Sequence, residues 1–171
     1  MANLRLKIPN FIKPYEAEIL INYWNKNERL CSDLSSSHAE RNLHMKDISN
    51  LQVKEILKYI THKGSFFVDH FFNTKCLPFQ DPIICRWKKG HSMNFHVDQN
   101  INETEDKILM NYSTLLYLND NFEGGSLVFK NGEKYKPKAF EIIMFESGPE
   151  NEHGVETVES GFRYTVPLWY S

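Results

Sequence analysis

The spacing of apolar residues changes about halfway along the chain, and this change predicts where helices give way to strands. In the first part, residues 13–27 and 47–72 carry apolar side chains at helical spacing. Ser49 is a candidate N-cap of the second helix, and Gly64 is a candidate interruption within it. The polar residues 28–42 between the two segments predict a loop.

The second part of the chain is built from short apolar or alternating runs that are rich in Ile, Val, Tyr, Phe and Trp. Turn residues such as those in KKG, NDNFEGG and KNGE separate these runs. The runs read PIICRW, MNFHVD, STLLYLN, GSLVF, EIIMFES, HGVETV and FRYTVPLWY. Such spacing predicts an antiparallel sandwich or jelly roll and argues against β-α-β units.

Together these patterns predict an α+β fold in a single domain that spans residues 1–171. Helices over about residues 1–80 would support a double-stranded β-helix, or jelly-roll, core over about residues 81–171. Residues 99–111 begin polar and follow directly on Asp98, so we expect them to form a mobile loop over the chemistry of that residue.

Composition narrows the function without identifying it. With 20 basic and 22 acidic residues, the chain gives no electrostatic reason to expect nucleic acid or an anionic membrane as a partner. No apolar run approaches the length of a membrane span, and the first residues lack the apolar region of a signal peptide. Three cysteines at spacings that match no metal or redox motif predict reduced thiols and a cytoplasmic location.

The candidate chemistry begins in the stretch NFHVDQN. His96 and Asp98 lie two residues apart, which places them on the same face of a strand. His153 begins another short run downstream. Two imidazoles and one carboxylate bind one face of a divalent metal and leave three positions open, as in non-haem Fe(II) oxygenases. Zinc would favour a closed set, often with thiolates, and no cysteine is close in sequence to either histidine.

Arg163 shares one face of its predicted strand with Thr165, Pro167 and Trp169. Two interpretations are open for this arginine. It is either an outward-facing strand charge or an inward-facing group that requires a carboxylate partner. The arginine alone favours the first interpretation. A metal site nearby favours the second, with the carboxylate supplied by a ligand.

Three segments, in order, resemble the Fe(II)/2-oxoglutarate-dependent dioxygenases, in particular the prolyl 4-hydroxylase-like branch. They are RWKKGHSMNFHVD, STLLYLNDNFEGGSLVF and HGVETVESGFRYTVPLWY. The similarity covers most of residues 83–170 and, more faintly, IPNFIKPYEAEILI near the start. Trp87 stands where a tyrosine is usual in this family, and Met93 replaces a second aromatic residue.

The resemblance implies a set of roles for individual residues. His96, Asp98 and His153 would hold Fe(II), and Arg163 would pair with the distal carboxylate of 2-oxoglutarate. Tyr117 would donate its hydroxyl to the same carboxylate. From the residues alone, a buried core tyrosine is an equally good interpretation of Tyr117. The resemblance further implies O2 as cosubstrate and ascorbate as an accessory reductant.

The implied activity is hydroxylation of a prolyl residue in a peptide or protein, of the procollagen or HIF prolyl 4-hydroxylase type, with decarboxylation of 2-oxoglutarate to succinate. Trp169 and Trp87 would lie near the substrate. Two alternatives are the same chemistry on another residue or a free amino acid, and a non-catalytic jelly-roll binding module. A nucleic-acid substrate is disfavoured, because related demethylases carry a second arginine six positions after the first, where this chain has Trp169. We therefore expect a proline-containing partner and neither nucleic acid nor membrane.

Overall fold

Two α-helices form where apolar residues recur at helical spacing. The computed structural model describes residues 4–33, 41–99, 101–102, 107–108 and 110–171. Within them, α1 spans Pro14–Lys26 and α2 spans Leu51–Phe72. Asn50 caps α2 by accepting a hydrogen bond from the Val53 backbone N–H at 3.0 Å, so the predicted cap at Ser49 was one residue early.

The predicted strands pair into two main antiparallel sheets. The larger sheet has the order β1-β12-β8-β15-β4-β3-β2, and the smaller has the order β11-β10-β13-β5. Their strands are β1 (Arg5–Ile8), β2 (Ser32–Asp33), β3 (Arg41–His44), β4 (Ile83–Lys88), β5 (Met93–His96), β8 (Tyr112–Tyr117), β10 (Leu127–Phe129), β11 (Lys134–Tyr135), β12 (Ile142–Glu146), β13 (His153–Val155) and β15 (Phe162–Tyr170). The antiparallel arrangement is confirmed.

Short elements complete the described part of the chain. Two further strand pairs are β9 (Glu123–Gly124) with β14 (Val158–Ser160), and β6 (Ile101–Asn102) with β7 (Lys107–Ile108). The 3-10 helices are η1 (Glu28–Leu30), η2 (Met45–Asp47) and η3 (Pro149–Asn151). The pair β6–β7 lies inside the predicted loop 99–111, whose residues 100, 103–106 and 109 lie outside the described residues.

The first part of the chain contributes strands that its pattern did not predict. β1 pairs with β12, and β3 pairs with β4, both in the larger sheet. The loop predicted over residues 28–42 is therefore wrong for the described residues of η1, β2 and β3. These strands are at most four residues long and pair with distant segments, so no local alternation identifies them.

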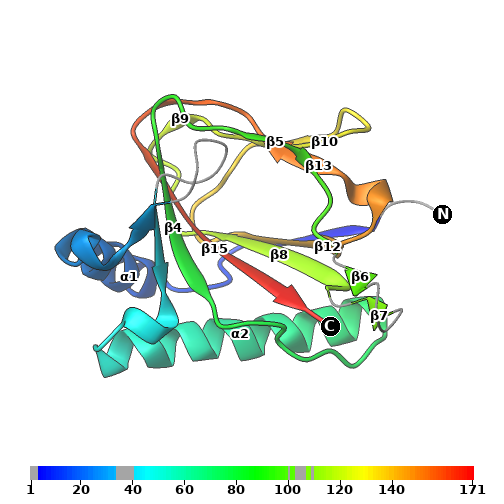
Figure 1. The fold of residues 1–171 in the computed structure, drawn as a ribbon, viewed down its shortest axis with the longest axis horizontal. Coiled ribbons are helices and arrows are strands. Elements are labelled where there is room, and N and C mark those ends of the chain that lie inside the picture. Colours follow the sequence, from blue (N-terminus) through cyan, green and yellow to red (C-terminus); the bar gives the residue numbers. More distant parts are fainter. Residues whose placement is uncertain (1–3, 34–40, 100, 103–106, 109) are drawn as a thin grey trace.

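The layers of the molecule follow from alternation along the strands. α2 runs along one face of the larger sheet, and the smaller sheet lies across the opposite face (Figure 1). On β15, Tyr164, Val166, Leu168 and Tyr170 join the apolar core that includes the two helices. The alternate residues Arg163, Thr165, Pro167 and Trp169 line a pocket between the two sheets. The predicted shared face of these four residues is confirmed.

Helix α2 passes Gly64 without interruption, contrary to the prediction from sequence. A Cβ atom at this position would lie 2.1 Å from the Tyr170 hydroxyl oxygen. The Tyr170 hydroxyl donates to the carbonyl of Thr61, 3.1 Å away. Gly64 therefore permits the close approach of α2 to β15 and is not a break in the helix.

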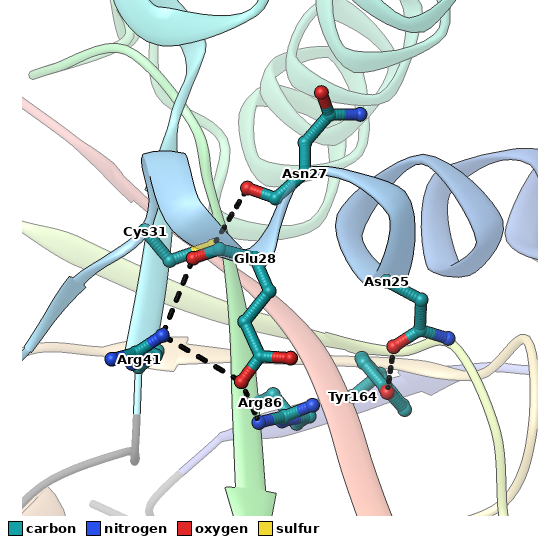
Figure 2. A network of polar contacts seen from close by, with 7 residues as sticks. All are labelled: Asn25, Asn27, Glu28, Cys31, Arg41, Arg86 and Tyr164. Carbon is teal, nitrogen blue, oxygen red and sulfur yellow. Dashed lines mark hydrogen bonds and ion pairs between the residues drawn. The ribbon is translucent and has the colours of Figure 1, made fainter.

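A polar network fastens α1 and η1 to strands β3, β4 and β15 of the larger sheet (Figure 2). The Glu28 carboxylate forms ion pairs with Arg86 at 2.9 Å and with Arg41 at 3.6 Å. The Tyr164 hydroxyl donates to the Asn25 side chain, 2.6 Å away. This network lies on the helical side of the sheet, so it stabilises the scaffold opposite the pocket.

Two sequence predictions about the whole molecule can be compared with the fold. None of the three cysteines, all within the described residues, forms a disulfide. No helix in the described part of the chain combines the length and apolar character needed to cross a lipid bilayer.

Candidate metal centre

Three side chains predicted as ligands converge at one end of the smaller sheet. His96 on β5 and His153 on β13 are cross-strand partners, and their ring centroids lie 4.4 Å apart. The Asp98 carboxylate lies 3.4 Å from His96 Nε2 and 3.6 Å from His153 Nε2. One ligand atom from each residue lies within 4.8 Å of the others, so the three can hold one metal ion between them.

Hydrogen bonds to backbone carbonyls orient both imidazoles. His96 Nδ1 lies 3.0 Å from the Asn94 carbonyl, and His153 Nδ1 lies 2.9 Å from the Asn151 carbonyl. A carbonyl only accepts, so each Nδ1 carries the proton and each Nε2 presents a lone pair. Both Nε2 atoms face Asp98, which is the arrangement that metal ligation requires.

The carboxylate is held in its ionised form. Burial disfavours the charge on Asp98, but the adjacent His96 and His153 imidazoles and the Ser113 hydroxyl outweigh burial and lower its pKa. Burial similarly opposes protonation of His96, yet its contact with Asp98 prevails and raises the pKa of His96. Burial lowers the pKa of His153, which favours the neutral imidazole. The cluster therefore offers an anionic oxygen and, at His153, a neutral nitrogen donor.

A pocket of about 250 Å³ extends from this cluster between the two sheets. Its walls are mostly apolar and include Ile83, Leu115, Leu127, Phe145, Val155 and Trp169. Apolar walls around a few polar groups are typical of a site that binds a small molecule and excludes water from it. The three candidate ligands and Arg163 line this same pocket.

Arg163 is completely buried, which rules out the outward-facing interpretation. Its Nε donates to the Gly125 carbonyl at 3.1 Å, and Gly125, at a φ of 62°, belongs to the predicted glycine turn. Nη1 and Nη2 have no hydrogen-bond partner among the described residues. Because a buried guanidinium without an acceptor is costly, this end of the pocket is suited to an anionic ligand.

Two aromatic residues flank the guanidinium. The Arg163 Cζ atom lies 5.0 Å from the Trp87 ring centroid and 5.2 Å from that of Tyr117. The Trp87 indole nitrogen and the Tyr117 hydroxyl are also buried without a hydrogen-bond partner among the described residues. Burial raises the pKa of Tyr117, so its hydroxyl keeps the proton and can donate. Three of these orphaned polar atoms belong to Arg163 and Trp87, which line the pocket, whereas the fourth belongs to Tyr117, which contacts the guanidinium but is not among the lining residues.

The structure therefore brings together most of the residues predicted from sequence. Trp169 lines the pocket, as does Trp87, which is buried beside Arg163. Sequence reasoning missed Ser113 and Asn151. The Ser113 hydroxyl contacts both Asp98 and the Ser147 hydroxyl, and the Asn151 carbonyl orients His153. Backbone carbonyls leave no signal in a sequence, whereas Ser113 lies four residues before Tyr117 on β8, so strand alternation could have placed the two on one face.

A group of candidate metal ligands and a buried arginine in one pocket between antiparallel sheets are typical of a metal-dependent enzyme. The family model described as the 2OG-Fe(II) oxygenase superfamily matches residues 83–171, more than half of the chain. The chain therefore belongs to the 2OG-Fe(II) oxygenase superfamily. Members of this superfamily use Fe(II), 2-oxoglutarate and O2, so these cofactor predictions are confirmed.

Among curated proteins, the chain is similar to prolyl 3-hydroxylases. It is 46% identical to human prolyl 3-hydroxylase 2 over an alignment of 66 residues that covers 35% of this chain and 9% of that protein. It is 29% identical to chicken prolyl 3-hydroxylase 1 over an alignment of 146 residues that covers 71% of this chain and 20% of that protein. The chain thus matches only a small part of the length of these relatives.

Solved structures of prolyl hydroxylases share the fold. A viral collagen prolyl hydroxylase from Paramecium bursaria Chlorella virus-1, in complex with 2OG, has a TM-score of 0.79 at 22% identity, covering 99% of this chain and 96% of that one. A Pseudomonas putida prolyl-4-hydroxylase has a TM-score of 0.75 at 14% identity, covering 99% and 92%. At these identities the likeness concerns the fold alone.

Proposed function

We propose that this chain is an Fe(II)- and 2-oxoglutarate-dependent dioxygenase that hydroxylates a prolyl residue in a peptide or protein. The observation that carries the proposal is the buried guanidinium of Arg163. Its Nη1 and Nη2 lack an acceptor in the same pocket that the His–Asp–His cluster lines. A dicarboxylate cosubstrate that reaches from a metal to an arginine suits such a pocket.

His96, Asp98 and His153 would hold the Fe(II). Two nitrogens and one carboxylate oxygen on one face of the ion leave positions open for a cosubstrate and for O2. The donor set fits Fe(II), because both Nε2 atoms face the ionised carboxylate and both Nδ1 atoms are already hydrogen-bonded. These roles are our assignment from the geometry.

Arg163, Tyr117 and Trp87 would bind the distal carboxylate of 2-oxoglutarate. A carboxylate offers about four lone-pair sites. Nη1 and Nη2 of Arg163 can occupy two of them as a fork, and the Tyr117 hydroxyl and the Trp87 indole N–H can occupy the others. Trp87 therefore belongs, in this proposal, to the cosubstrate end of the pocket instead of the substrate mouth that the sequence suggested.

The chemistry requires little further from the protein than orientation and exclusion of water. Fe(II) and 2-oxoglutarate, when bound, supply the decarboxylation of the cosubstrate to succinate and CO2, with one oxygen atom of O2 entering succinate and the other entering a substrate C–H bond. Arg163 fixes the far end of the cosubstrate, and the apolar walls keep water from the reacting centre. Asp98 stays ionised and therefore holds its position as an anionic ligand.

A peptide substrate is supported by the surroundings of the pocket and by the relatives. Trp169 and Pro167 line it, and Phe95, next to His96 on the edge strand β5, is 51% exposed. These apolar surfaces suit a proline ring. The relatives named above are prolyl 3- and 4-hydroxylases, so the prolyl 4-hydroxylase type implied by the resemblance stays a prediction, and the sequence does not identify the carbon that is hydroxylated.

Four further expectations complete the proposal. We propose that residues 1–171 form one catalytic domain and that the two facing sheets are the double-stranded β-helix expected from the sequence. The antiparallel strand orders and the likeness to solved prolyl hydroxylases support this assignment. A cytoplasmic location and stimulation by ascorbate stay predictions.

The proposal is tested by mass spectrometry of proline-containing peptides after incubation with the protein, Fe(II), 2-oxoglutarate and ascorbate. We expect one added oxygen atom on the peptide for each succinate formed, and none on a matched peptide with alanine in place of proline. Comparison of the hydrolysed product with 3- and 4-hydroxyproline standards then identifies the carbon.

Other outcomes would favour the alternatives. Succinate formation that responds to a different amino-acid residue, or to a free amino acid, would replace the prolyl assignment while keeping the chemistry. An absence of iron-dependent succinate under every condition would favour a non-catalytic binding module.

A further inference from the structure

Strand β1 carries a buried arginine from the edge of the larger sheet into the smaller sheet, near His153. The Arg5 side chain is only 2% exposed. Its Nε donates to the Asn151 side-chain oxygen at 2.9 Å, and its Nη1 forms an ion pair with Glu133. Its Cζ lies 3.6 Å from the centroid of the Phe129 ring. An arginine outside the pocket thus contacts the segment that leads to a candidate metal ligand.

We propose that Arg5 is a positioning residue for His153, acting through Asn151 and Phe129 to keep Nε2 of that histidine directed at the metal. The inference rests on the proposed metal centre. It adds that the N-terminal strand, which lies outside the matched family region 83–171, is required for tight metal binding.

The first connection runs through Asn151, the last residue of η3. This asparagine is 1% exposed, and its side-chain oxygen accepts the hydrogen bond from Arg5. Its backbone carbonyl accepts the bond from His153 Nδ1. Arg5 therefore fixes the side chain of the residue whose carbonyl determines the tautomer and the ring orientation of His153.

The second connection runs through Phe129. In the ladder between β10 and β13, Phe129 pairs directly with His153, and the two ring centroids lie 5.8 Å apart. Because the guanidinium of Arg5 lies over the phenyl ring, it limits the movement of a ring that packs against the imidazole. Arg5 thus restrains His153 from two sides.

The contacts of Arg5 and Asn151 stabilise the fold less than a fully hydrogen-bonded network would. Arg5 Nη2 and the Asn151 side-chain nitrogen are buried without a hydrogen-bond partner among the described residues. Each such donor costs about 1–3 kcal/mol, which offsets the hydrogen bonds that the network does form. A role in orienting the ligand accounts for a buried arginine better than stabilisation of the fold does.

The test uses Co(II) as a spectroscopic probe of the metal centre. Purified protein is titrated with Co(II), and the d–d absorption gives the dissociation constant. Arg5→Met keeps an apolar chain over Phe129 but removes every donor. We expect it to raise the Co(II) dissociation constant about 10-fold, at the lower end of the effect typical for loss of a direct partner of a metal-ligating histidine, because Arg5 acts through Asn151.

Lys7→Met is the matched control. Lys7 lies on the same strand and places its Nζ 4.7 Å from the centroid of the Tyr135 ring, on β11 of the smaller sheet. It resembles Arg5 in charge and in fastening β1 to that sheet. Its ring partner packs against Phe129, with the ring centroids 5.9 Å apart, but no hydrogen bond joins Lys7 to Asn151 among the described residues. We expect its Co(II) dissociation constant to stay within about twofold of the wild type. An equal loss in both variants would mean that Arg5 merely anchors β1.

Asn151→Ala separates positioning from folding. It leaves the ion pair between Arg5 and Glu133 in place and should weaken Co(II) binding by itself. If Arg5 acts through Asn151, the double variant should lose little more than Arg5→Met alone. Additive losses would contradict this route, and wild-type Co(II) binding by Arg5→Met would overturn the inference.

The proposed metal centre and the proposed role of Arg5 can be refuted separately. If Co(II) binding to the wild-type protein does not depend on Asp98, the metal centre itself is wrong. If it does depend on Asp98 but is unaffected by Arg5→Met, only the role of Arg5 is wrong.

Discussion

Replacing Arg163 by methionine should stabilise the ligand-free protein and abolish tight binding of 2-oxoglutarate. Methionine has a similar length and carries no charge. The guanidinium is 0% exposed, and in the absence of a ligand only its Nε has a hydrogen-bond partner among the described residues. A buried charge with a single hydrogen-bond partner destabilises the folded state, and a bound anion would remove this cost.

The magnitude follows from opposing contributions. Replacing buried ionic groups by apolar ones often stabilises a protein by about 1–4 kcal/mol. The lost contacts of Arg163 with the rings of Trp87 and Tyr117 would offset about 1 kcal/mol of this gain. A net gain of about 0–3 kcal/mol corresponds to a rise in Tm of up to about 12 °C for a chain of this size.

The effect on binding has the opposite sign. Two charge-assisted hydrogen bonds to the cosubstrate contribute about 1.5–3 kcal/mol each. Their loss should weaken 2-oxoglutarate binding by about 10²–10⁴-fold. Thermal melts with and without 2-oxoglutarate and calorimetric titration of the cosubstrate, both in the presence of a redox-inert divalent metal, measure the two effects separately.

Arg86→Met is the control for this experiment. Arg86 is also buried and also stacks on a tryptophan, Trp24, at 4.1 Å, but its guanidinium is paired with Glu28. Its replacement should lower the Tm and leave 2-oxoglutarate affinity unchanged. If Arg163→Met lowers the ligand-free Tm as Arg86→Met does, or binds 2-oxoglutarate like the wild type, the assignment of an anion site is refuted.

Three further predictions concern single positions. Trp87→Phe keeps a ring beside the guanidinium but removes one donor, so it should weaken 2-oxoglutarate binding by about threefold to tenfold in calorimetry. Trp24→Phe, far from the pocket, should leave the affinity unchanged, and equal effects of the two variants would refute the role of the indole. The Asp98 carboxylate outweighs burial and raises the pKa of His96, so a proton competes with the metal from a pH above the ordinary pKa of histidine. Co(II) affinity should therefore fall as the pH is lowered, beginning on the alkaline side of that ordinary value, and a flat profile would contradict this. Gly64→Ala should lower the free energy of unfolding by about 1–3 kcal/mol, because the new Cβ would meet the Tyr170 hydroxyl. Adding Tyr170→Phe should restore the Tm. A wild-type Tm for Gly64→Ala alone would count against the close contact.

Much of the fold could be predicted because its signals are local. The alternation in FRYTVPLWY placed Arg163 on the pocket face of β15, and helical spacing placed α1 and α2. β1 and β3 were missed because each is four residues long and owes its conformation to pairing with a distant strand. Gly64 was misread because its neighbour, Tyr170, is the penultimate residue of the chain.

The candidate site likewise contains residues that the sequence could predict and contacts that it could not. His96 and Asp98 are two positions apart, and His153 follows in a recognisable segment, so spacing and resemblance were sufficient. The contact between Arg5 and Asn151 joins residues 146 positions apart, and it has no signature in either segment. The burial of Trp87 beside Arg163 depends on the register of β4 with β15, which the sequence alone does not fix.

Iron-dependent formation of succinate, compared between the wild-type protein and Asp98→Ala, tests the central claim most directly. We expect the wild type to convert 2-oxoglutarate to succinate when Fe(II) and a proline-containing peptide are present. Asp98→Ala should form none while retaining its fold, and His62→Ala, which alters an exposed histidine on α2, should match the wild type. Undiminished succinate formation by Asp98→Ala would contradict the account.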